Sequence, residues 1–237
     1  MDIAIVTPEP TSDTAGNETT SARWRRILEE LGHRVRVAYD FEPERSTPDA
    51  LVALHAHKSH DSIERFEQHH PNRPLIVALT GTDLYEYRHR ADRVDQNVGR
   101  ADALVALQPR AADELPTSAR DRLHVAYQSV GLLADTEQFR RSPSFPDADE
   151  RFDVLVAAHL RDVKDPLRTA RAAARLPDDS DLRVRHVGSA RSEDWADRAR
   201  EAENRQPRFQ WLGEIPRPEA LERIGAADLL TVTSVLE

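Results

Sequence analysis

The chain has 237 residues, of which 39% are hydrophobic and 32% are charged, and its formal net charge is −9. This length allows one large domain or two smaller ones, and the acidic balance argues against nucleic acid as a general partner. The lack of cysteine excludes disulfides and thiol chemistry. The opening MDIAIVTPEP is too short and too acidic for a signal peptide, and no apolar run is long enough to span a bilayer. We therefore expect a cytoplasmic protein with no membrane partner.

The chain begins with a predicted βαβ unit. Residues 3–6 form a short apolar run that is typical of a buried strand, and residues 35–39 alternate as a second strand. Between them we predict a helix that begins near Thr19 and ends at Gly32, a C-cap glycine. The buried face of this helix is predicted to consist of Trp24, Ile27, Leu28 and Leu31. Such an opening is typical of a Rossmann-like sheet.

The polar loop between the first strand and the first helix holds a lone glycine, Gly16, rather than the GxGxxG fingerprint of a dinucleotide site. Ligands of parallel α/β sheets bind beyond the carboxyl ends of the strands. The loop can bring the backbone amides of Gly16 and the side chains of Asn17 and Thr20 to a ligand at that edge. A plain connecting loop explains these residues equally well.

Polar residues also follow two later strands of this half. The half is predicted to continue with strands at 51–54, 74–79, 103–107 and 123–127 and helices at 62–69 and 109–115. The polar residues that follow the first two of these strands are His55, Lys58, Thr80, Gly81, Thr82 and Asp83. Glycine lets the backbone approach a sugar or phosphate closely, and the hydroxyl and carboxylate groups can hydrogen-bond it.

Other interpretations of these residues stay open. Asp83 would be equally suitable as the N-cap of the next helix, and the histidines of HAHKSH can be solvated loop residues. We expect no metal site here, because His55 and His57 point to opposite sides of an extended strand. No carboxylate lies beside them at a spacing that is typical of zinc ligands.

A polar stretch rich in Asp, Ser and Pro, residues 131–150, is predicted to link two domains, residues 1–130 and 151–237. The second domain repeats the alternation of strands and helices. Its predicted strands are 154–157, 184–187, 209–212 and 229–233, and its predicted helices are 166–175, 193–204 and 218–225. We therefore predict an α/β protein of two Rossmann-like domains with a ligand cleft between them.

Three potential cations, His159, Arg161 and Lys164, follow the first strand of the second domain. Asp165 and Pro166 are then predicted to open a helix, as its N-cap and its first residue. Cations beside the positive end of a helix dipole can hold a phosphate or a diphosphate. Lys164 is one of only two lysines among 33 Lys and Arg residues, which draws attention to it. An ordinary loop with solvated basic residues is the competing interpretation.

The second domain resembles the donor domain of GT-B fold retaining glycosyltransferases of family four. The resemblance rests on the polar loop with its lysine, a strand ending in VG, a strand ending in WLGE, and AADLLTVTSVLE. In that family an Arg and a Lys five positions apart grip the donor diphosphate, and this spacing gives His159 and Lys164, with Arg161 as a further charge. Glu237 matches the first glutamate of the family's E-x7-E motif, which contacts the sugar, so the resemblance implies a catalytic set of Lys164, Arg161 and Glu237. The second glutamate would lie beyond Glu237, and we expect residues 1–237 to be an inactive fragment.

Further segments narrow this resemblance to the selenosugar synthases of selenoneine biosynthesis (SenB type). The segments are GNETTSARWRRILEELGHRVRV, LVALHAHKSHDSIERF, RPLIVALTGTDLY, ADALVALQPRAADELP, VAYQS, HLRDVKDPLRTARAA and WLGEIPR, which together span nearly the whole chain. Thr80 stands where the general family commonly has His, and this departure supports the narrower match. The resemblance implies transfer of a sugar from a UDP-sugar, such as UDP-N-acetylglucosamine, to selenophosphate, with formation of a carbon–selenium bond. It implies no cofactor and no metal, and a functional link to ergothioneine-like selenoneine synthases.

The resemblance also assigns the polar residues to two groups. The donor-binding residues are His159, Gly188, Gly213, Glu214 and Ile215. The sugar-binding or acceptor-binding residues are Gly16, Asn17, Thr20, His55, Lys58, Thr80, Gly81, Thr82 and Asp83, with Lys58 and Arg23 for the phosphate of the acceptor. Two alternatives stay open: a GT-B glycosyltransferase with a hydroxyl acceptor, and a non-catalytic protein that binds nucleotide sugars.

Overall fold

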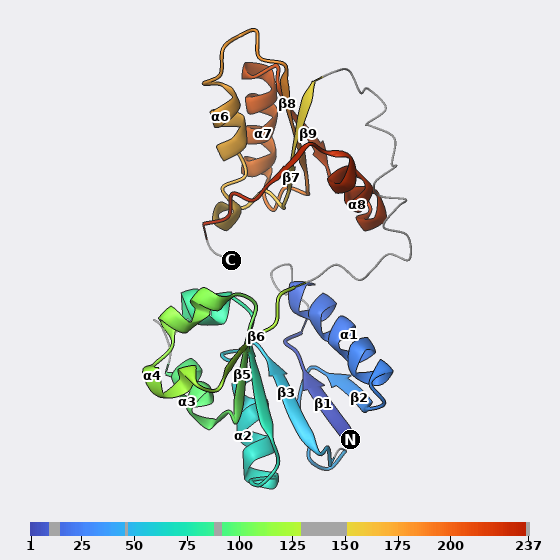
Figure 1. Ribbon diagram of the computed structural model, residues 1–237, viewed down its shortest axis with the longest axis vertical. Coiled ribbons are helices and arrows are strands. Elements are labelled where there is room, and N and C mark those ends of the chain that lie inside the picture. Colours follow the sequence, from blue (N-terminus) through green and yellow to red (C-terminus); the bar gives the residue numbers. More distant parts are fainter. Residues whose placement is uncertain (10–14, 46, 88–91, 129–150, 236–237) are drawn as a thin grey trace. The chain divides into compact units, whose positions relative to one another are not determined.

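The computed structural model describes residues 1–9, 15–45, 47–87, 92–128 and 151–235. It divides into two units, residues 1–131 and 132–237, each built on one parallel sheet with flanking helices (Figure 1). The prediction of an α/β protein with two Rossmann-like sheets is therefore confirmed. The predicted linker, residues 131–150, lies outside the described residues. Within the described ranges, no helix combines the length and the apolar composition that a membrane crossing requires.

The N-terminal unit has a sheet with the strand order β2-β1-β3-β4-β5-β6, in which all neighbouring strands are parallel. Its strands are β1 Asp2–Val6, β2 Arg34–Ala38, β3 Ala50–Leu54, β4 Leu75–Leu79, β5 Ala103–Ala106 and β6 Leu123–Val125. Its helices are α1 Ala15–Glu30, α2 His60–His69, α3 Arg93–Arg100 and α4 Thr117–Arg120, with a π-helical turn η1 Asp83–Tyr87 and a 3-10 helix η2 Pro109–Glu114. The strands lie where the apolar runs predict them, with small shifts of their ends.

Helix α1 differs from its prediction at both its start and its buried face. It begins at Ala15, so Gly16 and Asn17 lie in its first turn rather than in a loop. An acidic residue in the first turn, Glu18, favours this start, because it faces the positive end of the helix dipole. Trp24 and Leu28 pack against buried residues of β1 and β3. Ile27 is 38% exposed and Leu31 is 68% exposed, so the predicted burial of Ile27 and Leu31 was wrong.

Helix α3 is not among the predicted helices, because only two of the residues that it packs against the protein are apolar. Val94 and Val98 are both buried, one turn apart, and Asn97 is fully buried between them. The Asn97 side chain donates a hydrogen bond to the carbonyl oxygen of Ala56 at 2.7 Å and lies 3.2 Å from Nδ1 of His60. A buried amide with such partners is satisfied, but a pattern of hydrophobic positions does not reveal it.

The C-terminal unit has a parallel sheet with the strand order β10-β7-β8-β9. Its strands are β7 Phe152–Ala157, β8 Leu182–Val187, β9 Phe209–Gly213 and β10 Leu229–Thr231. Its helices are α6 Arg168–Ala173, α7 Glu193–Arg205 and α8 Arg217–Ala226, with a 3-10 helix η3 Asp162–Lys164. Val154, Val156 and Val184 pack against α6 and α7, whereas Leu155 and Val187 face the α8 side.

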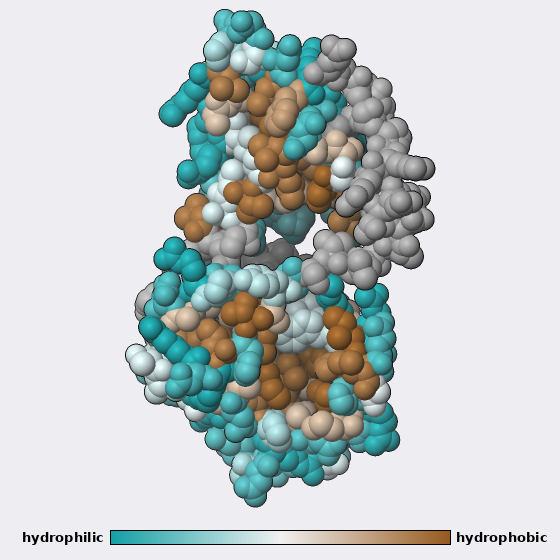
Figure 2. All heavy atoms as spheres, viewed as in Figure 1, coloured by the Kyte–Doolittle hydropathy of each residue, from teal (hydrophilic) through white to brown (hydrophobic). Residues whose placement is uncertain are grey.

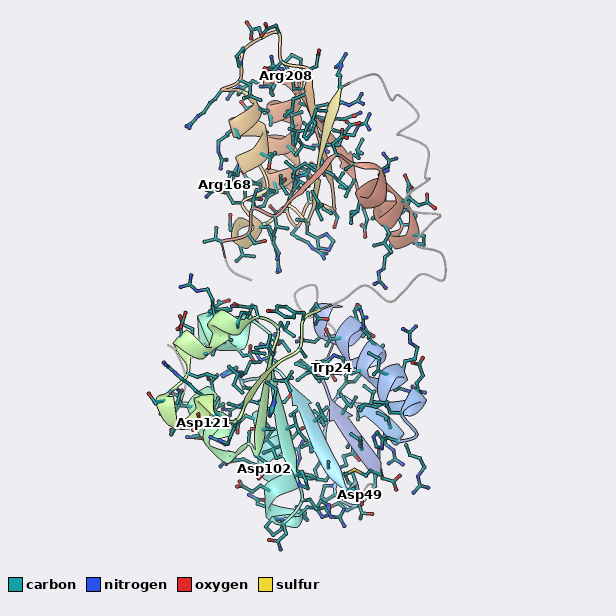
Figure 3. All side chains as sticks on the ribbon, viewed as in Figure 1. Trp24, Asp49, Asp102, Asp121, Arg168 and Arg208 are labelled. Atoms are coloured by element: carbon teal, nitrogen blue, oxygen red, sulfur yellow. The ribbon has the colours of Figure 1, made fainter. Side chains whose placement is uncertain are left out.

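Aspartates that precede strands hold neighbouring strands in register. In each case the backbone N–H of the aspartate donates to the carbonyl oxygen of a residue on the next strand, and its side chain accepts from the N–H of that same residue. Asp49 and Asp102 show the arrangement at the amino ends of β3 and β5 (Figure 3). The three pairs are Asp49 with Asp2, Asp102 with Leu75, and Asp228 with Asp153, and the side-chain bond is 2.8 Å in each.

Strand β10 forms one edge of the described part of the second sheet and exposes apolar side chains on both of its faces. Leu229 is 46% exposed and Leu230 is 43% exposed, and Val232 just beyond the strand is 71% exposed. Figure 2 shows hydrophobic atoms at the surface of this unit along the path that β10 takes in Figure 1. By contrast, the edge strand β2 of the first sheet carries the exposed charges of Arg34 and Arg36, which discourage pairing with another strand.

Candidate functional site

The predicted basic loop of the C-terminal unit is held against the loop that follows β8. The backbone N–H of Leu160 donates to Ser189 O at 2.9 Å, and the N–H of Arg191 donates to Leu160 O at 3.1 Å. Leu160 is fully buried between the two loops. These contacts bring the residues after β7 and the residues after β8 together at the carboxyl edge of the sheet, where α/β folds bind their ligands.

His159 is a neutral hydrogen-bonding group in this site rather than the third cation that the sequence predicts. Its Nδ1 lies 2.9 Å from the hydroxyl of Ser189. Burial lowers the pKa of His159, and the positive charge of Arg191 lowers it further, while Glu214 acts in the opposite direction. When the Ser189 hydroxyl donates to Nδ1, the other ring nitrogen carries the proton and can donate it in a hydrogen bond to an anion.

Gly188 permits the close approach of these loops. Its φ is +142°, and a Cβ atom at this position would lie 2.0 Å from the carbonyl oxygen of Ala158. The Gly188 N–H donates to Gly213 O at 2.7 Å, and Trp211 Nε1 donates to Gly188 O at 2.9 Å. Gly213 has a φ of +72°, so both predicted glycines adopt backbone conformations that side chains disfavour.

The two residues that follow Gly213 differ in exposure. Glu214 is exposed, which leaves its carboxylate accessible to solvent. Ile215 packs partly against the buried Leu155 and Val187, so its side chain contributes to the core on the α8 side.

Lys164 ends η3, and the segment after β10 fixes the backbone around it. The Thr233 hydroxyl donates to the carbonyl oxygen of Lys164 at 2.9 Å and to that of Asp165 at 3.1 Å. The N–H of Val235 donates to Val163 O at 2.8 Å. The lysine is therefore anchored through its main chain, and its side chain is half-buried.

The predicted N-cap role of Asp165 is wrong. Its φ and ψ are 36° and 58°, in the left-handed region, and α6 begins only at Arg168, with Leu167 as its N-cap. Its carboxylate binds the guanidinium groups of Arg168 at 2.6 Å and Arg171 at 2.7 Å, and the hydrogen bond from Arg171 is the main reason that its pKa is lowered. Helix α6 has six residues, so its dipole contributes little and the anion site depends on the cationic side chains.

Asp83 organises the carboxyl edge of the first sheet from inside the protein. It is fully buried, and its carboxylate accepts hydrogen bonds from the N–H groups of Ala56, Thr80, Gly81 and Leu84 at 2.8–3.1 Å. Burial raises its pKa to about 6, although these four bonds favour the charged form. The predicted contact between Asp83 and a sugar is not supported, because both of its carboxylate oxygens are already bound by backbone N–H groups of the protein.

His55 sits beside this loop in a strained backbone conformation. Its φ is 71°, its side chain is buried, and its Nε2 lies 3.1 Å from the hydroxyl of Thr82. The N–H of Lys58 donates to His55 Nδ1 at 3.2 Å. Burial lowers the pKa of His55 to about 3, with Lys58 as the next cause, so the ring is neutral. His55 therefore positions Thr82 and the turn that leads to the exposed Lys58.

Thr20 is also engaged within the protein. Its buried hydroxyl donates to Gly16 O at 2.9 Å and accepts from the side chain of Gln128 at 2.8 Å. Asn17 is half-buried in the first turn of α1, and Arg23 is half-buried further along the same helix. Thr80 and Gly81 are half-buried, and Thr82 is exposed, so this loop stays accessible.

Sequence reasoning missed Ser189, Arg191 and Gln128. The triplet of Val187, Gly188 and Ser189 at a strand end was a usable signal, but the partner of Ser189 lies 30 residues earlier in the chain. Glu237 lies outside the described residues. Among the described residues, no group of three or more His, Cys, Asp or Glu side chains is arranged to hold a metal ion.

No known family model matches the sequence, and no curated protein is significantly similar to it. Solved structures do match. HepE from Anabaena in complex with UDP has a TM-score of 0.66 and 15% identity, over 99% of this chain and 74% of HepE. The chain has the GT-B fold. Within this fold it also matches a glycosyltransferase from Rickettsia africae, with a TM-score of 0.68 and 13% identity over 99% of this chain and 73% of that one.

A third GT-B match is the catalytic domain of starch synthase IV from Arabidopsis thaliana, bound to ADP and acarbose. Its TM-score is 0.68 at 8% identity, over 99% of this chain and 78% of the other. At such low identities the matches establish the GT-B fold, and the activity has to be argued from the residues of this chain.

Proposed function

We propose that this protein is a glycosyltransferase that binds a UDP-sugar at the carboxyl edge of β7, β8 and β9. The observation that carries the proposal is the pairing of the loops after β7 and β8, which holds the segment with His159, Arg161 and Lys164 at the carboxyl edge of the sheet. The pKa of His159 responds to both Arg161 and Lys164, so their charges lie within range of its ring. The GT-B neighbour HepE, which was crystallised with UDP and with UDP-glucose, supports a nucleotide sugar as the donor.

In this proposal Lys164 and Arg161 neutralise the diphosphate, and His159 donates a hydrogen bond to it. Charge-assisted hydrogen bonds to a departing diphosphate stabilise the transition state more than the ground state, because negative charge develops on the leaving group. Gly213, Glu214 and Ile215 lie along the uracil in this arrangement, with Gly188 beside them. Glu237 contacts the sugar, as the sequence resemblance implies, and neither a metal nor a cofactor takes part.

We further propose selenophosphate as the acceptor. The sequence resemblance to selenosugar synthases supports it, and so does one feature of the first unit. His55, with a pKa of about 3, is too weak a base to deprotonate a hydroxyl acceptor. The carboxylate of Asp83 is already bound by four backbone N–H groups. An acceptor that arrives already ionised, as selenophosphate does, requires no such base.

The acceptor is expected beside the accessible part of the first unit. Thr80, Gly81 and Thr82 offer hydroxyl groups and a closely approachable backbone, and the first turn of α1 offers Gly16 and Asn17. The exposed Lys58 and the half-buried Arg23 are assigned to the phosphate of the acceptor. In this scheme Thr20 and His55 support the site rather than contact the substrate.

Calorimetric titration with UDP tests the donor site. Binding is the direct readout of the donor site, because it does not depend on the acceptor. We expect Lys164→Ala to weaken UDP binding about tenfold or more, the usual cost of losing a charge-assisted hydrogen bond. Lys58→Ala, which removes the other lysine, should leave UDP binding unchanged. A chain that does not bind UDP would refute the proposal.

Mass spectrometry tests the acceptor. UDP-N-acetylglucosamine is incubated with the protein and either selenophosphate, inorganic phosphate or a panel of hydroxyl acceptors. A selenium-containing sugar that forms with selenophosphate alone supports the specific proposal. A product that forms only with a hydroxyl acceptor would replace it with ordinary O-glycosyl transfer.

A further inference from the structure

Arg191 follows the turn after β8 and has no assigned role. Its side chain is exposed, and its guanidinium group forms no hydrogen bond or ion pair with another described residue. The next arginines along the chain are paired instead: Arg198 lies 3.6 Å from Asp194, and Arg200 lies 2.9 Å from Asp197. An unpaired arginine can bind an anion without first breaking an internal ion pair.

The backbone around Arg191 holds it next to the basic loop. The N–H of Arg191 is bonded to Leu160 O at 3.1 Å, and Leu160 lies between His159 and Arg161 in the chain. Leu160 and Ala190 also form an isolated parallel bridge. The backbone of Arg191 therefore lies at the same carboxyl edge of the sheet as the proposed diphosphate ligands. In the sequence, α6 and β8 separate it from them.

The charge of Arg191 affects the pKa of His159, so its guanidinium group lies near the imidazole ring. Coulombic effects weaken with distance, and among the charged groups Arg191 has the largest effect on the pKa of His159, ahead of Arg161 and Lys164. Glu214 is the acidic group with an opposite effect. Two further carboxylates, those of Glu193 and Asp194, begin α7, but they interact with Arg200 and Arg198 respectively.

We propose that Arg191 is a ligand of the donor diphosphate and supplies a third full positive charge to this site, beside those of Lys164 and Arg161. The inference rests on the proposed function. Arg191 adds its charge from the β8–α7 loop, where the Ser189 hydroxyl lies 2.9 Å from Nδ1 of His159. A guanidinium group suits this task because its fork matches two phosphate oxygens.

Titrations with UDP and with uridine separate the diphosphate from the nucleoside. We expect Arg191→Ala to weaken UDP binding about tenfold or more and to leave uridine binding unchanged. Arg191→Lys should fall between the wild type and Arg191→Ala, because it keeps the charge but loses the fork. Raising the salt concentration should weaken UDP binding less in Arg191→Ala than in the wild type.

Arg175→Ala is the matched control. Arg175 is also exposed, and its guanidinium group forms no hydrogen bond or ion pair with the described residues, but it follows α6 and precedes β8, at the amino edge of the sheet. UDP binding should not change in this variant. Arg217→Ala tests another arginine at the carboxyl edge, at the start of α8.

The outcomes are distinct. If the wild-type chain fails to bind UDP, the proposed function fails. If the wild type binds UDP and Arg191→Ala binds it equally well, or if Arg217→Ala is the variant that loses affinity, the role of Arg191 is refuted while the proposed function stands. Circular dichroism of Arg191→Ala and Arg191→Lys confirms that an altered affinity does not reflect misfolding.

Discussion

Gly188 shows how a single residue without a side chain sets the geometry of the donor site. Its φ of +142° and the 2.0 Å approach of a Cβ to Ala158 O leave no room for another residue. We predict that Gly188→Ala lowers the free energy of unfolding by more than about 3 kcal/mol, because backbone strain and a main-chain clash add together. UDP binding should be lost with it, since the displaced backbone carries His159. Denaturant unfolding and calorimetric titration measure the two effects.

Gly99→Ala is the control for this prediction. Gly99 is exposed in α3, and a Cβ there would meet no atom within 4 Å. Alanine favours a helix over glycine, so this variant should gain about 0.5–1 kcal/mol. Equal stability changes in the two variants would show that the tight contact around Gly188 is unimportant.

His55 makes the fold sensitive to acid. Its folded-state pKa of about 3 lies below the ordinary histidine value of 6.5, so below pH 6.5 the unfolded chain binds a proton that the folded chain does not. Its contribution is present above pH 6.5 and is lost as the pH falls toward 3. Uptake of one proton by the unfolded chain lowers the free energy of unfolding by about 1.4 kcal/mol for each pH unit of acidification, or by about 2 kcal/mol between pH 6.5 and pH 5.

We predict that His55→Asn removes this loss, so that the stability of the variant falls less between pH 7 and pH 5. Asparagine tolerates the left-handed conformation at φ 71°. Asp83 and His186, whose pKa values are also shifted, are present in both proteins, so the difference between the two pH profiles isolates His55. Parallel stability curves in urea at pH 5, 6 and 7 would contradict the prediction.

For individual residues, the sequence predicted where the site residues lie better than it predicted what their side chains do. The strand-end residues Gly188, Gly213 and Lys164 could be found because parallel strands end at one edge of the sheet. The roles of Asp83 and His159 could not, because they depend on partners from other loops: Asp83 binds an N–H group 27 residues away, and His159 meets a serine 30 residues away. Such long-range hydrogen bonds leave no periodic trace in the sequence.

Among the elements, the strands were the most predictable. Each buried parallel strand is a short run of apolar residues such as LIVAL in β4, which a sequence shows directly. Helix α3 was harder to predict, because it buries few residues. Its position depends on contacts with the sheet more than on its own apolar pattern. Helix α8, by contrast, lies within one residue of the predicted 218–225 at each end.

The aspartates that precede strands hold the amino ends of neighbouring strands together, and this role can be tested. Asp102→Ala removes the acceptor of the Leu75 N–H at the amino end of β4. We expect the variant to lose about 1 kcal/mol of unfolding free energy, the net value of one hydrogen bond. Asp121→Ala is the control, since Asp121 is exposed, lies near the start of β6 and forms no such bond with the described residues (Figure 3). Equal urea midpoints for the two variants would contradict the anchoring role.

Across the whole molecule, each unit has its own hydrophobic clusters, two in the first unit and two in the second. Separate cores allow the units to melt as separate cooperative transitions. Under the proposed function UDP binds only the second unit, so it should stabilise only that transition. At about 100 times its dissociation constant, UDP adds about 2.7 kcal/mol to the stability of the state that binds it.

We therefore predict that scanning calorimetry of the full chain shows two transitions, and that saturating UDP raises the midpoint of one of them by roughly 10 °C. Lys164→Ala should reduce this shift to about half or less, because a tenfold weaker affinity leaves UDP at about 10 times its dissociation constant, where it adds only about 1.4 kcal/mol. Asp102→Ala should lower only the transition that UDP leaves in place, which assigns that transition to the first unit. A single transition that moves as a whole with UDP would mean that the two units unfold together, and the ligand would then stabilise both sheets at once.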